Sequence, residues 1–281
     1  MASEADYYEQ AALWDAQHLA DSSSIDERLD RTLALLPADA GCVVDVGAGD
    51  GRFVRLLAGR PDGPPVFAVE RSRTALGRIG VAGVQASAEA LPFGDASVDT
   101  LCALEVIEHL PVEIYARALA ELARVARRYV VISVPNRERI ERAHVTCPVC
   151  RCRYSPSRHL RTFTPDSLAS LLPGFTARSV AEFGHRAYWY PRALRVGLER
   201  LGVLDRPGLP QCPQCGAGLR HTAAPPAPGE DSARSGDPRP AEAAGVRRRG
   251  YDLARRLAPR ARHPYYLAAV LERRAPTGGR A

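Results

Sequence analysis

The chain has 281 residues and 46% of them are hydrophobic, which suits one α/β domain with insertions and a sizeable core. No apolar run approaches the ~18 residues of a transmembrane helix, so we expect no membrane span. The acidic start Met1–Asp6 lacks the apolar segment of a secretory signal, which predicts a cytoplasmic protein. The formal net charge is +6, and all 38 strongly basic residues are arginine, a balance that permits a nucleic-acid partner without requiring one.

Residues 1–36 predict an N-terminal helical cap. Its first part carries the aromatic residues Tyr7, Tyr8 and Trp14. Its second part has the apolar period of an amphipathic helix, formed by Ile25, Leu29, Thr32, Leu33 and Leu36.

From residue 37 to residue 136 the pattern alternates between strands and helices. Strands are expected at 42–47, 65–70, 83–86, 98–104 and 128–134. Such alternation predicts a parallel sheet with helices on both faces, and ligands of such sheets bind at the carboxyl ends of the strands. The residues at or just past those ends are Asp45, Glu70, Ala88, Glu89 and Glu105, so one cleft can collect them.

The first strand runs into three alternating glycines, Gly47, Gly49 and Gly51, and then into a helical period. A strand, a glycine turn and a helix N-terminus let the backbone approach a ligand closely. Glu70 ends the next strand, roughly 20 residues later, where a carboxylate can accept hydrogen bonds from ribose hydroxyls. The spacing is G-x-G-x-G, which departs from the G-x-G-x-x-G of dinucleotide-binding proteins.

This stretch resembles motif I of the class I S-adenosylmethionine (SAM)-dependent methyltransferases, of the methyltransferase type 11 kind. Further motifs follow in the family's order, at Ala88–Phe93, Ser97–Asp99 and Glu105–Leu110. The resemblance implies a Rossmann-like, mostly parallel seven-stranded sheet whose last strand, at 265–271, is antiparallel. It also implies SAM as the cofactor. The cofactor-binding residues would be Asp45, Gly47, Ala48, Gly49, Glu70, Arg71, Ala88, Glu89 and Glu105.

Within that set, Asp45 and the glycines would hold the methionine end of SAM and Glu70 the ribose, while the segment of Ala88 and Glu89 would border the adenine. Small-molecule members of the family often cover the cofactor with an aromatic N-terminal helix. The aromatic residues of the N-terminal cap would do this here, or would simply pack on the domain surface. Both interpretations remain open.

Four of the seven cysteines form two C-P-x-C pairs, Cys147 with Cys150 and Cys212 with Cys215. Two such knuckles can supply the four thiolates of a tetrahedral Zn²⁺ site, and a cytoplasmic protein disfavours the alternative of disulfides. We therefore predict a structural zinc, with Cys152 as a further candidate ligand. The remaining cysteines, Cys42 and Cys102, lie in predicted strands and should be core residues.

Glu105, Glu108 and His109 follow a predicted strand end, and in a helical turn their spacing would place all three on one face. This E-x-x-E-H resembles the metal motif of the small-RNA 3′-end 2′-O-methyltransferases and of the ubiquinone-pathway O-methyltransferases. Both families add a later histidine, for which His159 is the candidate. The cluster would hold a divalent ion such as Mg²⁺ or Mn²⁺; alternatively His109 is a base without metal, or neither role applies.

The remaining segments divide by composition. Residues 137–163 form an insertion with the first knuckle, and 185–221 carry the second knuckle. Residues 164–184 continue the core, with a helix that starts at Thr164 and Pro165 and a strand around 175–183. Residues 222–246 predict a disordered linker, and 247–281 a basic helix with the last strand.

The resemblance implies methylation, and we expect O-methylation of a small biosynthetic metabolite such as a sugar or phenol, with His109 and Glu108 as catalytic candidates. An RNA acceptor is one alternative, because knuckles and arginine-rich segments are compatible with RNA. An inactive SAM-fold protein that binds a partner is the other. No membrane partner is expected.

Overall fold

A computed structural model of the chain describes residues 7–11, 13–14, 22–147, 149–186, 212–215 and 261–275. The predicted linker at 222–246, most of the second insertion at 185–221 and most of the basic helix at 247–262 lie outside these residues. No helix in the described ranges is long and apolar enough to cross a bilayer.

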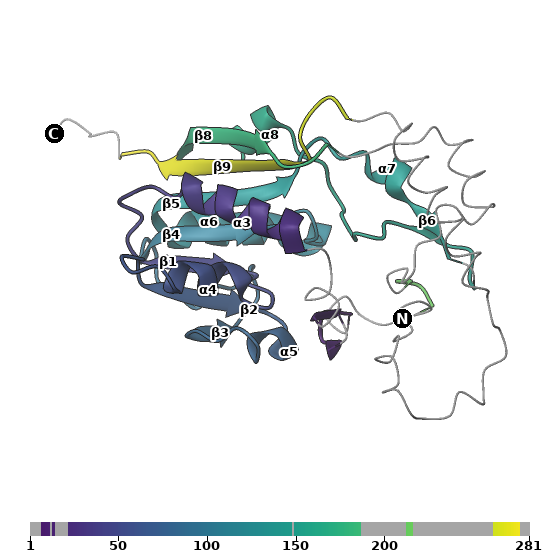
Figure 1. The fold of residues 1–281 in the computed structure, drawn as a ribbon, viewed down its shortest axis with the longest axis horizontal. Coiled ribbons are helices and arrows are strands. Elements are labelled where there is room, and N and C mark those ends of the chain that lie inside the picture. The colour runs from purple at the N-terminus through teal and green to yellow at the C-terminus, as the bar shows by residue number, and fades with distance from the viewer. Residues whose placement is uncertain are drawn as a thin grey trace.

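A seven-stranded sheet forms the centre of the molecule, in the order β3-β2-β1-β4-β5-β9-β8 (Figure 1). The first five strands along the chain pair in parallel, and β9 is antiparallel to both of its neighbours. The strands are β1 Val43–Val46, β2 Val66–Glu70, β3 Gly83–Gln85, β4 Val98–Leu104, β5 Ala126–Pro135, β8 Phe175–Phe183 and β9 Tyr266–Arg273. Each lies where the sequence predicts a strand, and the antiparallel last strand is confirmed.

Helices cover both faces of the sheet because alternate strand residues point to opposite sides. On one face, Leu29 and Leu33 of α3 and Phe53 of α4 pack in a buried cluster. On the other face, Leu122 of α6 and Leu168 of α8 pack in a second cluster. The helices are α3 Ser22–Leu35, α4 Arg52–Ala58, α5 Arg73–Leu76, α6 Val112–Val125, α7 Ile140–Ala143 and α8 Pro165–Ala169.

The predicted start of α8 is confirmed in detail. Thr164 is the N-cap, its hydroxyl accepts from the backbone N–H of Ser167, and Pro165 stands in the first turn. This capping box satisfies backbone N–H groups that a helix start leaves without partners.

Between β5 and α8 the chain leaves the sheet to form the first insertion. The insertion holds α7 and a two-stranded hairpin of β6 (Val145–Thr146) and β7 (Arg153–Tyr154). In Figure 1 this insertion lies beyond the end of the sheet from which β5 exits, on the same side as residues 212–215.

Candidate cofactor cavity and cysteine cluster

The glycine loop links the end of β1 to the start of α4. Gly47, Gly49 and Gly51 have φ angles of 75°, 57° and 82°, a left-handed conformation that strains other residues. A Cβ on Gly47 would lie 2.7 Å from Val106 Cγ2, and one on Gly49 would lie 3.2 Å from the ring of Trp14. The loop therefore needs glycine both for its turn and for the close approach of neighbouring groups.

Glu70 joins the end of β2 to this loop. One carboxylate oxygen accepts the N–H of Gly49 at 2.8 Å, and the other accepts the N–H of Ser72 at 2.8 Å. Burial raises the pKa of Glu70, and the hydrogen bonds from these backbone groups oppose that shift. The carboxylate is thus held rigidly beside the glycine turn, with lone pairs left for a ligand.

A cavity of about 440 Å³ opens at the carboxyl ends of β1, β2 and β4. The predicted residues that line it are Asp45, Gly47, Ala48, Gly49, Glu70, Arg71, Ala88, Glu105 and His109. Glu89 differs from the prediction: it is absent from the lining, and Arg117 Nε donates to its carboxylate at 3.1 Å. The cavity therefore collects the predicted cofactor-binding residues except Glu89, which instead forms a surface ion pair.

The N-terminal segment forms one wall of the cavity through Tyr7, Tyr8 and Trp14. It is fixed by Glu9, whose carboxylate accepts the N–H groups of Arg73 at 2.9 Å and Thr74 at 3.1 Å in the first turn of α5. Of the two interpretations left open by the sequence, the structure favours a cover over the cavity, because these rings face its interior.

Asp45 and Arg28 are charged residues of the cavity wall that each have a buried atom without a hydrogen-bond partner among the described residues. Asp45 is 3% exposed, and its Oδ1 has no hydrogen-bond partner among the described residues. Arg28 of α3 likewise has a buried Nη1 without a hydrogen-bond partner among the described residues. Burial raises the pKa of Asp45 to about 7, although the positive charge of Arg28 opposes the shift.

Glu108, His109 and His159 offer ligand atoms that all lie within 4.8 Å of one another. Glu108 is fully buried, and neither of its carboxylate oxygens has a hydrogen-bond partner in the described ranges. Burial raises its pKa well above the usual range, with the charge of Glu105 adding to the effect. Desolvation lowers the pKa of His109 to about 3, with the charge of His159 adding to it, so the imidazole is neutral at physiological pH.

The predicted helical turn from Glu105 to His109 is not present. Glu105 has a left-handed φ of 58°, and residues 107–109 form a turn rather than a helix. The Glu105 carboxylate instead accepts from the hydroxyl of Ser133 at 3.0 Å and lines the cavity. It is absent from the group of Glu108, His109 and His159, and of these three only His109 lines the cavity.

The segment after β7 supports this group. His159 Nδ1 pairs with Glu138, its ring lies 4.8 Å from that of His109, and the N–H of Leu160 donates to Glu108 O at 2.8 Å. Within the same segment, Pro156, Ser157 and Arg158 line the cavity, and Arg158 lies 3.5 Å over the ring of Tyr7. The first insertion therefore contributes part of the cavity wall.

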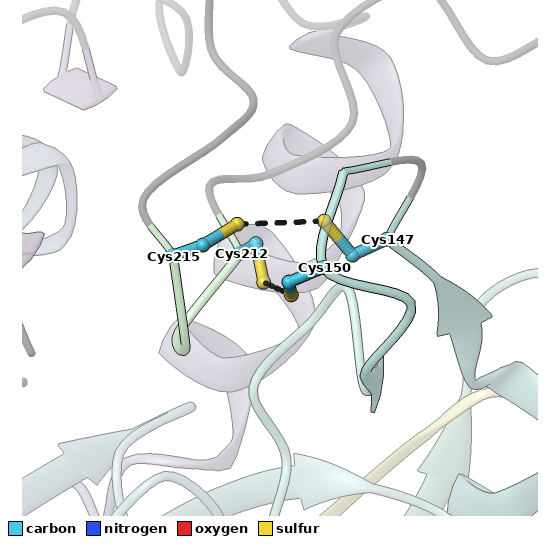
Figure 2. Close-up of side chains that lie close together, drawn as sticks. All are labelled: Cys147, Cys150, Cys212 and Cys215. Carbon is cyan, nitrogen blue, oxygen red and sulfur yellow. Dashed lines mark hydrogen bonds between the residues drawn. The ribbon is translucent and has the colours of Figure 1, made fainter.

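The cysteine cluster lies at the tip of the same insertion. Figure 2 shows the sulfurs of both C-P-x-C pairs pointing toward one another. Cys147 Sγ lies 3.6 Å from Cys215 Sγ, and Cys150 Sγ lies 3.6 Å from Cys212 Sγ. A tetrahedral zinc with Zn–S bonds near 2.3 Å separates its sulfurs by about 3.8 Å, whereas a disulfide needs about 2.05 Å.

All seven cysteines are free thiols, so the cluster is not cross-linked. Backbone N–H groups of each knuckle point at its first sulfur: the N–H of Cys150 lowers the pKa of Cys147. Burial raises the pKa of Cys212, yet the N–H groups of Cys215 and Gln214 bring it to about 6. Cys152 Sγ lies 3.2 Å from Cys212 Sγ, outside the group of four.

The sequence-based predictions miss several residues of the site, among them Arg28, Glu138 and Arg158. Arg28 could have been noticed, because a charged residue interrupts the apolar stripe between Ile25 and Leu29. Glu138 and Arg158 lie in an insertion whose path no local pattern predicts.

Residues 17–178 match the protein family described as a methyltransferase domain. Over 144 residues the chain is 33% identical to probable SAM-dependent methyltransferases of Mycobacterium tuberculosis strains CDC 1551 and H37Rv. This similarity covers 46% of the chain and 46% of each relative, so the chain spans about half the length of the curated relatives it matches.

Among solved structures, the chain resembles one from the complex of the Haloferax volcanii Trm112 methyltransferase activator with a methyltransferase. The TM-score is 0.54 at 14% identity, covering 99% of this chain and 100% of the other. It also resembles a SAM-dependent methyltransferase from Archaeoglobus fulgidus, with a TM-score of 0.52 at 17% identity over 93% and 98% of the two chains. These similarities establish the fold.

Proposed function

The chain belongs to the methyltransferase domain family, and on that premise we propose that it transfers the methyl group of SAM to an oxygen of a small metabolite. The observation that carries this proposal is the single cavity shared by the glycine loop, Glu70 and His109. The sulfonium of SAM supplies the methyl group, so the protein has to bind the cofactor, align the acceptor and assist loss of its proton.

The glycine loop and Glu70 would hold the cofactor at the carboxyl ends of β1 and β2. Glu70 accepts two backbone N–H groups and retains acceptor capacity for ribose hydroxyls. The aromatic N-terminal wall would exclude water from the methyl group. The acceptor would then enter beside His109, between this wall and the segment of Arg158.

Between the two roles considered for His109, the geometry favours that of a metal ligand. A base with a pKa of about 3 holds a proton weakly, which suits neither acceptance nor storage of the acceptor's proton. Among the described residues, the oxygens of Glu108 and Nδ1 of His109 have no hydrogen-bond partner, and such buried atoms are the kind that an ion satisfies. The Glu138 carboxylate pairs with Nδ1 of His159, and such a carboxylate commonly orients a metal-binding histidine.

Glu108, His109 and His159 would accordingly hold a divalent ion such as Mg²⁺ or Mn²⁺, with Glu105 left to the cofactor side. Such an ion would supply a positive charge that favours the ionised acceptor oxygen. Cys147, Cys150, Cys212 and Cys215 would hold a structural Zn²⁺, since their sulfur spacing suits a tetrahedral ion.

The proposal is tested by titrating the purified chain with SAM and then assaying methyl transfer from labelled SAM. We expect SAM binding, and label transfer to phenol or sugar acceptors. Transfer to RNA with a steep salt dependence would instead favour the RNA alternative. If correctly folded protein did not bind SAM, the proposed methyltransferase activity would be refuted and the partner-binding alternative favoured.

A further inference from the structure

Arg158 is a charged residue of the cavity wall that lies beside His109. It lines the cavity together with Pro156 and Ser157 of the first insertion. Its backbone hydrogen-bonds to the His109 ring, which fixes the two residues relative to each other. Its guanidinium carbon lies 3.5 Å from the centre of the Tyr7 ring, which belongs to the N-terminal segment. Arg158 therefore lies where that segment and the insertion meet, next to the proposed entry of the acceptor.

The backbone of Arg158 adopts a strained conformation. Its φ of 55° is left-handed, which is uncommon for residues other than glycine. Such strain persists only where the surrounding structure enforces it, and it clusters at sites that clamp ligands. The N–H of Arg158 donates to Ser155 O at 3.1 Å and closes the turn. The strained turn thus holds the guanidinium in the cavity wall.

Arg158 differs in its surroundings from two other cations of the cavity wall. Arg28 lies near the carboxylates of the cofactor side, where its charge opposes the rise in pKa that burial causes. Arg52 Nε lies 3.8 Å from a carboxylate oxygen of Asp50. Arg158 instead hydrogen-bonds to the side chain of Tyr7, a neutral group. A guanidinium has five N–H donors, more than one phenol oxygen can accept, so Arg158 has the capacity to bind an anion as well.

Apolar side chains line the cavity around His109. Leu110 and Pro111 follow it in the chain, and Ile114 reaches the cavity from the first turn of α6. Across from them, the ring of Tyr8 lies 6.5 Å from that of His109, measured between centroids. This lining suits a flat apolar body with few polar groups better than a sugar with many hydroxyls.

We propose that the acceptor is an apolar hydroxy acid, such as a hydroxylated aromatic acid, whose carboxylate binds Arg158 while its hydroxyl lies beside His109. The planar donors of a guanidinium match a carboxylate in a bidentate manner. In the reaction the S–CH₃ bond of SAM breaks as the O–CH₃ bond forms, the hydroxyl proton leaves to solvent, and S-adenosylhomocysteine remains. The inference rests on the proposed function and narrows its acceptor from sugars and phenols to hydroxylated acids.

The test measures binding of acceptor probes, by isothermal titration, to protein saturated with S-adenosylhomocysteine. The probes are the ortho, meta and para isomers of hydroxybenzoate and the methyl ester of each. Wild-type protein should bind at least one isomer roughly 10- to 150-fold more tightly than its ester, as expected for one charged hydrogen-bonded pair. Arg158→Ala should lose this preference by weakening the acid alone, and Arg158→Lys should keep part of it. Methyl transfer from labelled SAM should form the ether of the bound acid; formation of the ester would overturn the inference.

The matched control is Arg153→Ala, which removes an exposed arginine of β7 and should leave both affinities unchanged. Circular dichroism should verify the fold of each variant. Equal weakening of acid and ester by Arg158→Ala would overturn the inference, since Arg158 would then only support the cavity wall. A wild type that binds no hydroxybenzoate, or binds the esters as tightly, would also overturn it, as would tighter binding of phenyl phosphate than of every hydroxybenzoate. Failure of folded protein to bind S-adenosylhomocysteine would instead refute the proposed function itself.

Discussion

Replacement of Glu70 gives the sharpest test of the cofactor site. Its carboxylate receives two backbone N–H groups at 2.8 Å, and its remaining lone pairs are available to ribose hydroxyls. Loss of a hydrogen bond to a charged group costs about 1.5–3 kcal/mol. Glu70→Ala should therefore weaken SAM binding roughly 10- to 150-fold, measured by isothermal titration.

The substitution also leaves the N–H groups of Gly49 and Ser72 without their partner, which would disturb the glycine loop. A double-mutant cycle separates the two effects. S-adenosylhomocysteine is compared with an analogue that lacks the ribose hydroxyls, in wild-type protein and in Glu70→Gln. If Glu70 binds the ribose, removing the hydroxyls should weaken binding in the wild type by much more than in the variant.

The matched control is Glu89→Ala, whose carboxylate pairs with Arg117 outside the cavity and whose loss should leave the affinity unchanged. Equal effects of hydroxyl removal in wild-type protein and in Glu70→Gln would show that Glu70 does not contact the ribose. Unchanged SAM affinity in a folded Glu70→Ala would refute the assignment of the whole strand end.

Three further predictions concern the metal sites and pH. Purified protein should contain one Zn²⁺ per chain by metal analysis; Cys212→Ser should release it, and Cys42→Ser should not. Burial raises the pKa of Asp45 to about 7, and the ammonium group of SAM would pair with the ionised form of Asp45. SAM affinity should therefore fall as the pH drops below about 7, by up to about tenfold per pH unit. Asp45→Asn should abolish this dependence in titrations between about pH 5.5 and about pH 7.5. Brief chelation should abolish methyl transfer until Mn²⁺ is restored, and His159→Ala should impair transfer as severely as His109→Ala; activity that survives chelation would exclude the ion.

The sheet and the cofactor loop could be predicted because their signals are local. The buried parallel strand Val43–Val46 is a run of valines interrupted only by Asp45, and the alternating glycines that follow it indicate a tight turn. The two cysteine pairs were also found by spacing alone, and the structure brings them together across 61 intervening residues.

The residues that support the site from distant parts of the chain could not be predicted in this way. Glu138 meets His159 only because the chain returns from the first insertion, and Arg28 joins Asp45 in the cavity wall only because α3 packs against the sheet. The expected helical turn that begins at Glu105 is absent for a local reason. One left-handed residue turns its carboxylate away from the direction that a helical period would give.

The segment from Pro156 to Arg161 has a consequence for how tightly an acceptor can bind. It begins two residues after the β6–β7 hairpin, and Leu160 and Arg161 hydrogen-bond to the 105–110 loop. Ordering a residue costs about 1–2 kcal/mol of conformational entropy. If the thiolates hold zinc as proposed, the ion orders this segment of the cavity wall before an acceptor binds, although it does not contact the segment. Acceptor affinity would then be higher when the zinc site is occupied, because the ordered wall loses less conformational entropy on binding.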